Sequence, residues 1–169
     1  MTETNIGQRF DRLPASSSER TVAGRPTRDA VLDWWNERFG VPREAFDGYT
    51  FWEKGSGKLW AFAGSVPSPT TVEALGITFL RVRQEHWKPT TDAVQRFGSN
   101  ATKNVITLDD PQARAFVNGK DQELSWDGDW GYLIVTHDLA GEPEPLGVGL
   151  YLYDELRSQI PKGRQREID

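Results

Sequence analysis

Apolar side chains first recur at helical spacing within residues 27–40. The members of this stripe are Val31, Leu32, Trp34, Trp35 and Phe39. Thr27 is a residue type that caps helix N-termini, and Gly40 followed by Pro42 is typical of a helix end. The pattern therefore predicts a helix that starts after Thr27 and ends at Gly40.

Residues 1–26 lack such a pattern. They are polar, include the run Ser16–Ser18, and show no sustained periodicity. We expect this stretch to be disordered or loosely docked, with Phe10 and Leu13 able to dock on the domain.

Aromatic runs after the predicted helix indicate strands. Residues 49–52 and 59–62 flank the glycine-containing segment 53–58, which predicts a β-hairpin, and residues 77–82 predict a further strand. Together with the helix, these elements predict a small α/β domain over residues 27–87. The Lys58 segment (Gly55-Ser56-Gly57-Lys58) lacks the Ser/Thr and the following helix of a phosphate-binding loop, so it is interpreted as the hairpin turn.

The second half of the chain mixes short helices with strands. A short helix is predicted from residue 90 to Phe97, ended by Gly98, and another begins at Asp110-Pro111. Strands are predicted at residues 104–108, 123–124, 132–136 and 146–153. The order of these elements predicts an α+β chain whose residues 88–169 form a small, partly closed barrel of mostly antiparallel strands.

The segment 145–166 joins a glycine-containing strand to a cationic tail. Gly147 and Gly149 are two residues apart, so they share one face of an extended strand. Pro161 and Gly163 disfavour a helix in the tail that carries the cations. A bare strand face beside positive charges predicts a seat for a polyanion.

Several motifs in this half resemble a known family. The sequences PLGVG (145–149), LRS (156–158) and IPKGR (160–164) occur in this order, and the sequence WKPT (87–90) with Ala93 and RFG (96–98) precedes them. They resemble the PUA-like RNA-binding domain appended to RsmF-type (NOL/NOP/Sun) rRNA 5-methylcytosine methyltransferases. The resemblance covers residues 88–166 and implies a PUA-like pseudo-barrel that binds RNA.

In such an arrangement the helix after the first strand, its following turn and the final strand border one RNA groove. The resemblance and the placement of cations together predict a set of RNA-binding residues. The set is Lys88, Arg96, Lys103, Arg114, Lys120, Gly147, Gly149, Lys162, Arg164 and Arg166.

Composition limits the other possibilities. The chain of 169 residues has a net charge of −5, so any RNA contact must come from local clustering of cations and not from overall charge. No apolar run has the length of a membrane span, and the start of the sequence lacks an apolar signal segment, which predicts a cytoplasmic protein. There is no cysteine, which excludes thiolate metal sites and the cysteine nucleophile of the methyltransferases.

No other catalytic pattern appears. His86 and His137 each follow or precede a carboxylate, but no set of three or four metal ligands has suitable spacing. The sequence has no strand followed by a glycine-rich start of a helix, the pattern typical of a dinucleotide or S-adenosylmethionine site. We therefore expect no enzyme activity, cofactor or metal.

These observations predict a non-catalytic protein that binds structured rRNA or tRNA. Its partners would be the RNA and a separate RNA-modifying enzyme or ribosome assembly factor. One alternative is a protein–protein adaptor built on a barrel that no longer binds RNA. Another is a small enzyme that uses Glu85, His86 or Asp138.

One aromatic segment is either part of the core, as tryptophans of a small barrel usually are, or a surface on which bases stack. Trp126 and Trp130 bracket the sequence DGD (127–129). Exposed aromatic rings stack on unpaired bases, but two aspartates in the same turn disfavour close approach of phosphates.

Overall fold

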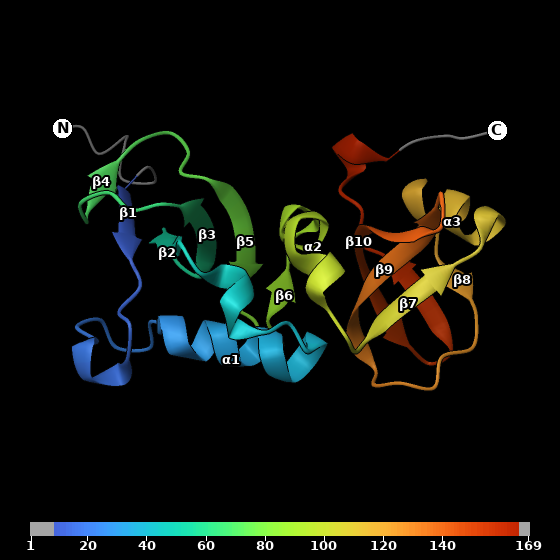
Figure 1. The fold of residues 1–169 in the computed structure, drawn as a ribbon, viewed down its shortest axis with the longest axis horizontal. Helices are drawn as coiled ribbons and strands as arrows, with labels where there is room; N and C mark the ends of the chain where they lie inside the picture. The colour runs from blue at the N-terminus through green and yellow to red at the C-terminus, as the bar shows by residue number, and fades with distance from the viewer. Residues whose placement is uncertain (1–8, 166–169) are drawn as a thin grey trace. The chain divides into compact units, whose positions relative to one another are not determined.

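The protein is described by a computed structural model in which residues 9–165 are placed (Figure 1). The chain divides into two compact units. The first comprises Met1–Glu37 and Pro42–Lys88, and the second comprises Arg38–Val41 and Pro89–Asp169. Both units combine helices with a sheet, which confirms the α+β class.

The first unit contains a six-stranded sheet in the order β4-β1-β2-β3-β5-β6. Its strands are β1 (Arg9–Arg12), β2 (Tyr49–Lys54), β3 (Lys58–Ala63), β4 (Thr70–Thr71), β5 (Ile77–Arg81) and β6 (Lys88–Pro89). Its helical elements are η2 (Ser17–Glu19), α1 (Arg28–Phe39) and η3 (Arg43–Phe46). The pairs β1–β2, β1–β4, β2–β3 and β3–β5 are antiparallel.

Helix α1 forms where the apolar stripe predicted it. The Thr27 hydroxyl accepts a hydrogen bond from the Ala30 amide (3.0 Å), and Gly40 ends the helix with a φ of +67°. Trp35 stacks on Phe79 of β5 at 5.3 Å between ring centroids, and Phe79 stacks on Phe51 of β2 at 4.9 Å. The aromatic residues of the helix and of the strands thus share one core.

The predicted hairpin is β2–β3. Lys54 pairs with Lys58 across a turn whose Gly55 and Gly57 both have positive φ, as the glycine content of this segment predicted.

The N-terminal segment differs from its expectation. Residues 9–12 form β1, which pairs with β2 and β4 instead of remaining irregular. Phe10 and Leu13 are buried, and the Phe10 ring packs edge-to-face on Trp60 at 5.3 Å. A four-residue strand with one apolar anchor is too short to show periodicity, so only its pairing partners reveal it. Residues 1–8 lie outside the described residues.

The second unit contains a mixed five-stranded sheet that curls into a half-barrel, in the order β7-β9-β10-β11-β8 (Figure 1). Its strands are β7 (Val105–Leu108), β8 (Gln122–Glu123), β9 (Gly131–Leu139), β10 (Glu142–Leu152) and β11 (Glu155–Ser158). Its helical elements are α2 (Thr91–Phe97), η4 (Gly98–Asn100), α3 (Asp110–Val117) and η5 (Lys162–Arg164). Strand β7 is parallel to β9, and the other pairs are antiparallel, as the prediction of a mostly antiparallel barrel requires.

Local chemistry explains where the two helices of this unit begin. Asp109 and Gln112 form a capping box at the start of α3, in which each side chain bonds the other residue's amide (2.9 and 3.0 Å). At α2, the Thr90 hydroxyl accepts from the Ala93 amide (3.0 Å).

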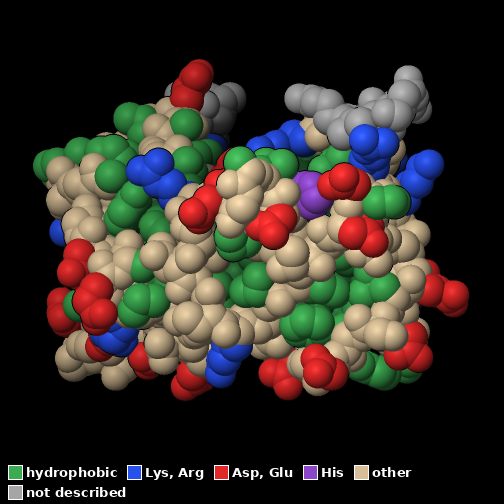
Figure 2. Space-filling model, turned by 45° about the vertical axis from the view of Figure 1, so that its right-hand side comes forward, with side chains coloured by type: hydrophobic (Ala, Val, Ile, Leu, Met, Phe, Trp, Pro, Cys, Tyr) green, Lys and Arg blue, Asp and Glu red, His purple; other side chains and the backbone are tan. Residues whose placement is uncertain are grey.

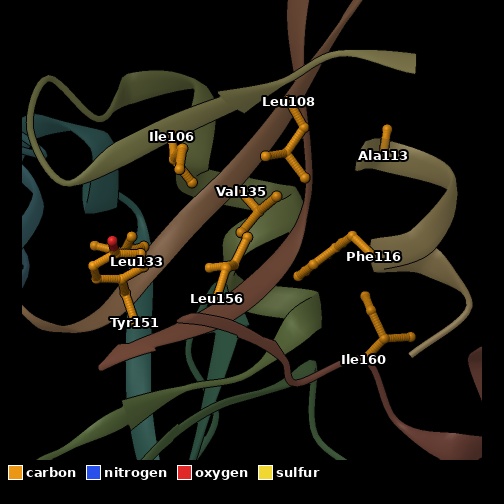
Figure 3. Close-up of a cluster of buried hydrophobic side chains, with 9 residues drawn as sticks. All are labelled: Ile106, Leu108, Ala113, Phe116, Leu133, Val135, Tyr151, Leu156 and Ile160. Atoms are coloured by element: carbon orange, nitrogen blue, oxygen red, sulfur yellow. The ribbon is translucent and has the colours of Figure 1, made fainter. Parts of the chain in front are cut away.

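One apolar cluster fills the half-barrel (Figure 3). Its buried members are Ile106, Leu108, Ala113, Phe116, Leu133, Val135, Tyr151, Leu156 and Ile160. In Figure 3, Phe116 of α3 points toward the side chains of the strands, so this helix closes one side of the core. Within residues 9–165, no helix has both the length and the apolar character needed to cross a membrane.

Candidate nucleic-acid interface

The segment after β11 lies against the end of α3. The Ser158 hydroxyl donates to the Phe116 carbonyl (2.8 Å), and the Ser158 amide donates to the Asp121 carboxylate (3.1 Å). Ile160 belongs to the core cluster beside Phe116. Strand β11 and the residues that follow it are therefore fixed to the C-terminal end of α3.

The same segment is fixed to α2 by Arg164. Its guanidinium donates to the Asp92 carboxylate (2.8 Å) and to the Gln95 side-chain oxygen (2.9 Å). Gln95 in turn donates to the Leu146 carbonyl of β10 (3.0 Å). Arg164 and Asp92 are both about 40% exposed, so water screens their attraction. The ion pair orients η5 and offsets part of the positive charge of Arg164.

The turn after α3 approaches the end of η5. A Cβ added to Gly119 would lie 2.2 Å from the Gln165 side-chain nitrogen. Lys120, the next residue, is exposed. This contact brings Lys120 to the side of the unit on which η5 lies.

We call Arg96, Lys120, Lys162 and Arg164 the cationic surface. They come from α2, the turn after α3, and η5, and all four are exposed. Lys120 and Lys162 form no ion pair with any other residue of 9–165. Figure 2 shows Lys and Arg side chains at the upper right, interspersed with Asp, Glu and His side chains. An anion can approach these charges without displacing a carboxylate from either lysine.

The remaining predicted cations are Lys88, Lys103, Arg114 and Arg166. The Lys103 amide donates to the Phe39 carbonyl (3.1 Å), and its side chain packs beside Gly40; β7 begins at the opposite end of this unit from η5 (Figure 1). Lys88 belongs to the first unit, where burial and the neighbouring Arg81 lower its pKa. Arg114 is exposed on α3, and Arg166 lies outside the described residues.

The expectation of a bare, accessible glycine face is wrong. Gly147 and Gly149 are buried. A Cβ at Gly147 would lie 2.7 Å from the Ile160 side chain, and one at Gly149 would lie 2.6 Å from Leu156 and 2.9 Å from Val135. These glycines admit core side chains instead of a ligand, because the half-barrel curls over the face that a flat strand would expose.

The residues of the small-enzyme alternative are spread over both units. His86 and Glu85 form a 3.5 Å pair in which both side chains are more than 80% exposed. His137 is mostly buried, with its ring nitrogens 2.8 Å from the Leu108 carbonyl and 3.0 Å from the Asp110 carboxylate. Asp138 is exposed on β9. Within residues 9–165, no three His, Cys, Asp or Glu side chains form a group suited to holding a metal ion.

Two residues of the interface were missed by sequence reasoning. Asp92 and Gln95 hold Arg164 but precede it by 72 and 69 positions. Their spacing on α2 carries no sign of this role, since only the fold brings η5 to that helix.

Comparison with known proteins divides the chain in a similar way. Residues 103–166 match the family described as the methyltransferase RsmF PUA domain, and residues 1–76 match a family of unknown function, DUF7122. The chain is also 23% identical over 113 residues to the ribosomal RNA small subunit methyltransferase F of Aeromonas salmonicida (strain A449). That alignment spans 65% of this chain and 23% of the relative. The resemblance found in the motifs is thus confirmed for residues 103–166, and it suggests association with RNA.

Proposed function

We propose that this protein, whose residues 103–166 are a PUA domain of the RsmF methyltransferase type, binds structured rRNA or tRNA through the cationic surface and catalyses no reaction itself. It would serve ribosome biogenesis or RNA modification, by assisting assembly or by presenting RNA to a separate modifying enzyme. The observation that supports the proposal is that α2 and the turn after α3, which carry Arg96 and Lys120, contact Arg164 and Gln165 at the end of η5, the element that also carries Lys162.

The chemistry of the surface suits RNA more than a small ligand. Double-stranded RNA is recognised through phosphates and 2′-hydroxyls across its shallow minor groove, without deep insertion of side chains. The cationic surface offers exposed ammonium and guanidinium groups on short elements that the core holds in place. Lys162 in η5 and Lys120 in the turn after α3 would contact phosphates.

The absence of catalysis is supported by composition. RsmF-type enzymes, as the motif resemblance implies, attack the base through cysteine, and this chain contains none. The Glu85–His86 pair lies open to solvent, not in an enclosed pocket of the kind that usually holds a substrate.

Charge reversal at η5 tests the proposal. In the variant with Lys162→Glu and Arg164→Glu, we expect affinity for transfer RNA to fall at least about tenfold in moderate salt, because two phosphate contacts are replaced by repulsion. Fluorescence anisotropy with labelled RNA measures the change. The matched control carries Arg20→Glu and Arg83→Glu, two exposed cations of the first unit, and so has the same net charge. Equal affinities for both variants would contradict the proposal.

A second variant should act in the opposite direction. Asp92→Asn removes the carboxylate beside Arg164 and leaves an oxygen that accepts the same hydrogen bond. We expect RNA affinity to rise by about two- to fivefold, because the variant lacks a negative charge that would repel the RNA phosphates near η5. An unchanged affinity would place the RNA away from η5.

The adaptor alternative is favoured by the net charge of −5. It predicts that the wild-type protein shows no affinity for transfer RNA or ribosomal RNA even in low salt, which the same anisotropy measurement detects.

A further inference from the structure

The second unit exposes a pair of aromatic rings that the RNA-binding surface does not use. Trp130 is 51% exposed and Tyr153 is 74% exposed, and their rings meet edge-to-face with centroids 4.9 Å apart. Trp130 precedes β9, and Tyr153 lies in the turn between β10 and β11. Two large aromatic side chains that contact each other in solvent, rather than in the core, indicate a contact surface for another molecule.

The turn that presents Tyr153 has an unfavourable sequence for its geometry. Leu152 pairs with Glu155, so Tyr153 and Asp154 form a two-residue loop, and both have positive φ (+53° and +65°). This is the backbone pattern of a type I′ turn, which favours Asn-Gly. A bulky aromatic residue in the left-handed region is strained, and residues held this way concentrate at functional sites. Tyr153 therefore occupies a position that the local backbone geometry disfavours for it.

The surroundings of the pair are acidic. Asp127, Asp129 and Asp154 are exposed on the two loops that carry the rings. The Leu124 amide donates to the Asp154 carbonyl (3.1 Å), which ties the chain before the first loop to the turn of Tyr153. Within the first loop, the Trp126 indole donates to the Asp129 carbonyl (3.0 Å). The position of Asp154 has an electrostatic effect: burial first, and then this carboxylate, raise the pKa of Tyr151.

Arg38, which lies beside these loops, does not cancel the negative charge of their aspartates. Arg38 donates to the carbonyls of Tyr132 (2.6 and 3.0 Å) and Trp130 (3.3 Å), and its guanidinium lies 3.9 Å from the Asp129 carboxylate. It therefore serves mainly to fix the backbone under Trp130. Asp129 remains 75% exposed.

From this arrangement we propose that Trp130 and Tyr153 form a docking surface for an arginine-rich segment of a partner protein. The electron-rich faces of the rings attract a cation, and the three carboxylates add a negative potential around them. A guanidinium stacks on an aromatic face and bonds a carboxylate through paired N–H groups, which an ammonium does less well. We name Trp130, Tyr153, Asp127, Asp129 and Asp154 the acidic aromatic surface.

The same charges disfavour RNA at this place. A nucleobase that stacked on Tyr153 would bring its phosphate toward Asp154, and the neighbouring Asp127 and Asp129 would repel the next phosphates. The surface is therefore distinct in function from the cationic surface around η5.

The test is a titration with an arginine–glycine peptide that carries no aromatic residue. We expect the indole N–H signal of Trp130 to shift in the NMR spectrum of the full chain. Tyr153→Asn should weaken binding about tenfold, by removing one cation–aromatic contact. The thermal midpoint of this variant should equal or exceed that of the wild type, because asparagine suits the turn, so weaker binding would not reflect unfolding.

Further variants and a second peptide distinguish the contributions of the carboxylates, of the guanidinium group and of the rest of the surface to peptide binding. Asp154→Asn should weaken binding severalfold at low salt, whereas Leu139→Ala, which removes an exposed apolar side chain (52%) from the β9–β10 hairpin, should leave it unchanged. A lysine–glycine peptide of equal charge should bind more weakly than the arginine peptide. The Lys162→Glu and Arg164→Glu variant should retain peptide binding, which makes this outcome independent of the RNA proposal.

Two results would overturn the inference. One is an unchanged Trp130 signal, or a shift that Tyr153→Asn does not affect. The other is a shift produced by a single-stranded oligonucleotide and not by the arginine peptide, which would make the rings a base-stacking surface instead.

Discussion

Gly147 and Gly149 illustrate how a single residue can be misassigned from sequence. Their spacing places them on one face of β10, and this part of the prediction holds. The sequence pattern does not reveal whether that face is covered, and here the side chains of Ile160, Leu156 and Val135 occupy it. The same spacing fits a ligand seat and a tight core, since both require the absence of a Cβ.

The packing of Gly149 leads to a stability prediction. Gly149→Ala would place a methyl group 2.6 Å from Leu156 and 2.9 Å from Val135, so we expect a loss of about 1–3 kcal/mol in the free energy of unfolding. Urea denaturation followed by fluorescence measures it. Gly163→Ala is the control, because no heavy atom lies within 4 Å of its added Cβ and its φ is not positive. Equal stability of the two variants would contradict the close packing.

At the level of elements, helix starts were the most predictable features. Thr27, Thr90 and the Asp110-Pro111 pair marked three helices, because capping depends on residues adjacent in sequence. The cap of α3 is Asp109, one residue before the Asp110 expected in that role. Strand β1 escaped detection, since its pairing with β2 spans about forty residues and its own pattern is short. The placement of η5 on α2 through Arg164 likewise depends on a contact between distant segments.

The capping box of α3 supports a prediction about this helix. Asp109→Ala leaves the Gln112 amide without its side-chain acceptor, and we expect the free energy of unfolding to fall by about 1 kcal/mol. Asp109→Asn should retain most of the stability, because asparagine caps as well as aspartate. Asp138→Ala, which removes an exposed carboxylate from β9, controls for the change in charge. Thermal denaturation distinguishes these variants, and a loss that is equal for Asp109→Ala and Asp138→Ala would exclude the cap as its cause.

For the whole molecule, the distribution of charge matters more than its sum. A net charge of −5 disfavours RNA at long range, while the exposed cations of the proposed cationic surface would favour it locally. The acidic aromatic surface lies in the same unit, so one domain carries two regions of opposite sign. Arg38–Val41 also belong to this unit, although they precede its remaining residues by almost fifty positions.

This distribution predicts a shallow salt dependence of RNA binding. With at most four phosphate contacts, the slope of log K against log salt concentration should lie between about −2 and −3.6. Anisotropy titrations with transfer RNA at several salt concentrations provide the slope. A value near zero would exclude phosphate contacts, and one much steeper would require cations beyond the cationic surface. The double variant at η5 should reduce the slope by about 2, and the control at Arg20 and Arg83 should not change it.

Local pattern was sufficient for the helices, the β2–β3 hairpin, the α+β class and the family of the C-terminal domain, because capping, turns, alternation and short motifs are properties of neighbouring residues. It did not predict β11 or the early start of β10 at Glu142. Local pattern did not predict where the cations lie, and it did not predict that Gly147 and Gly149 are buried. Those depend on how far the sheet curls and on which distant segments pack together, and the burial of apolar side chains over the whole half-barrel governs both.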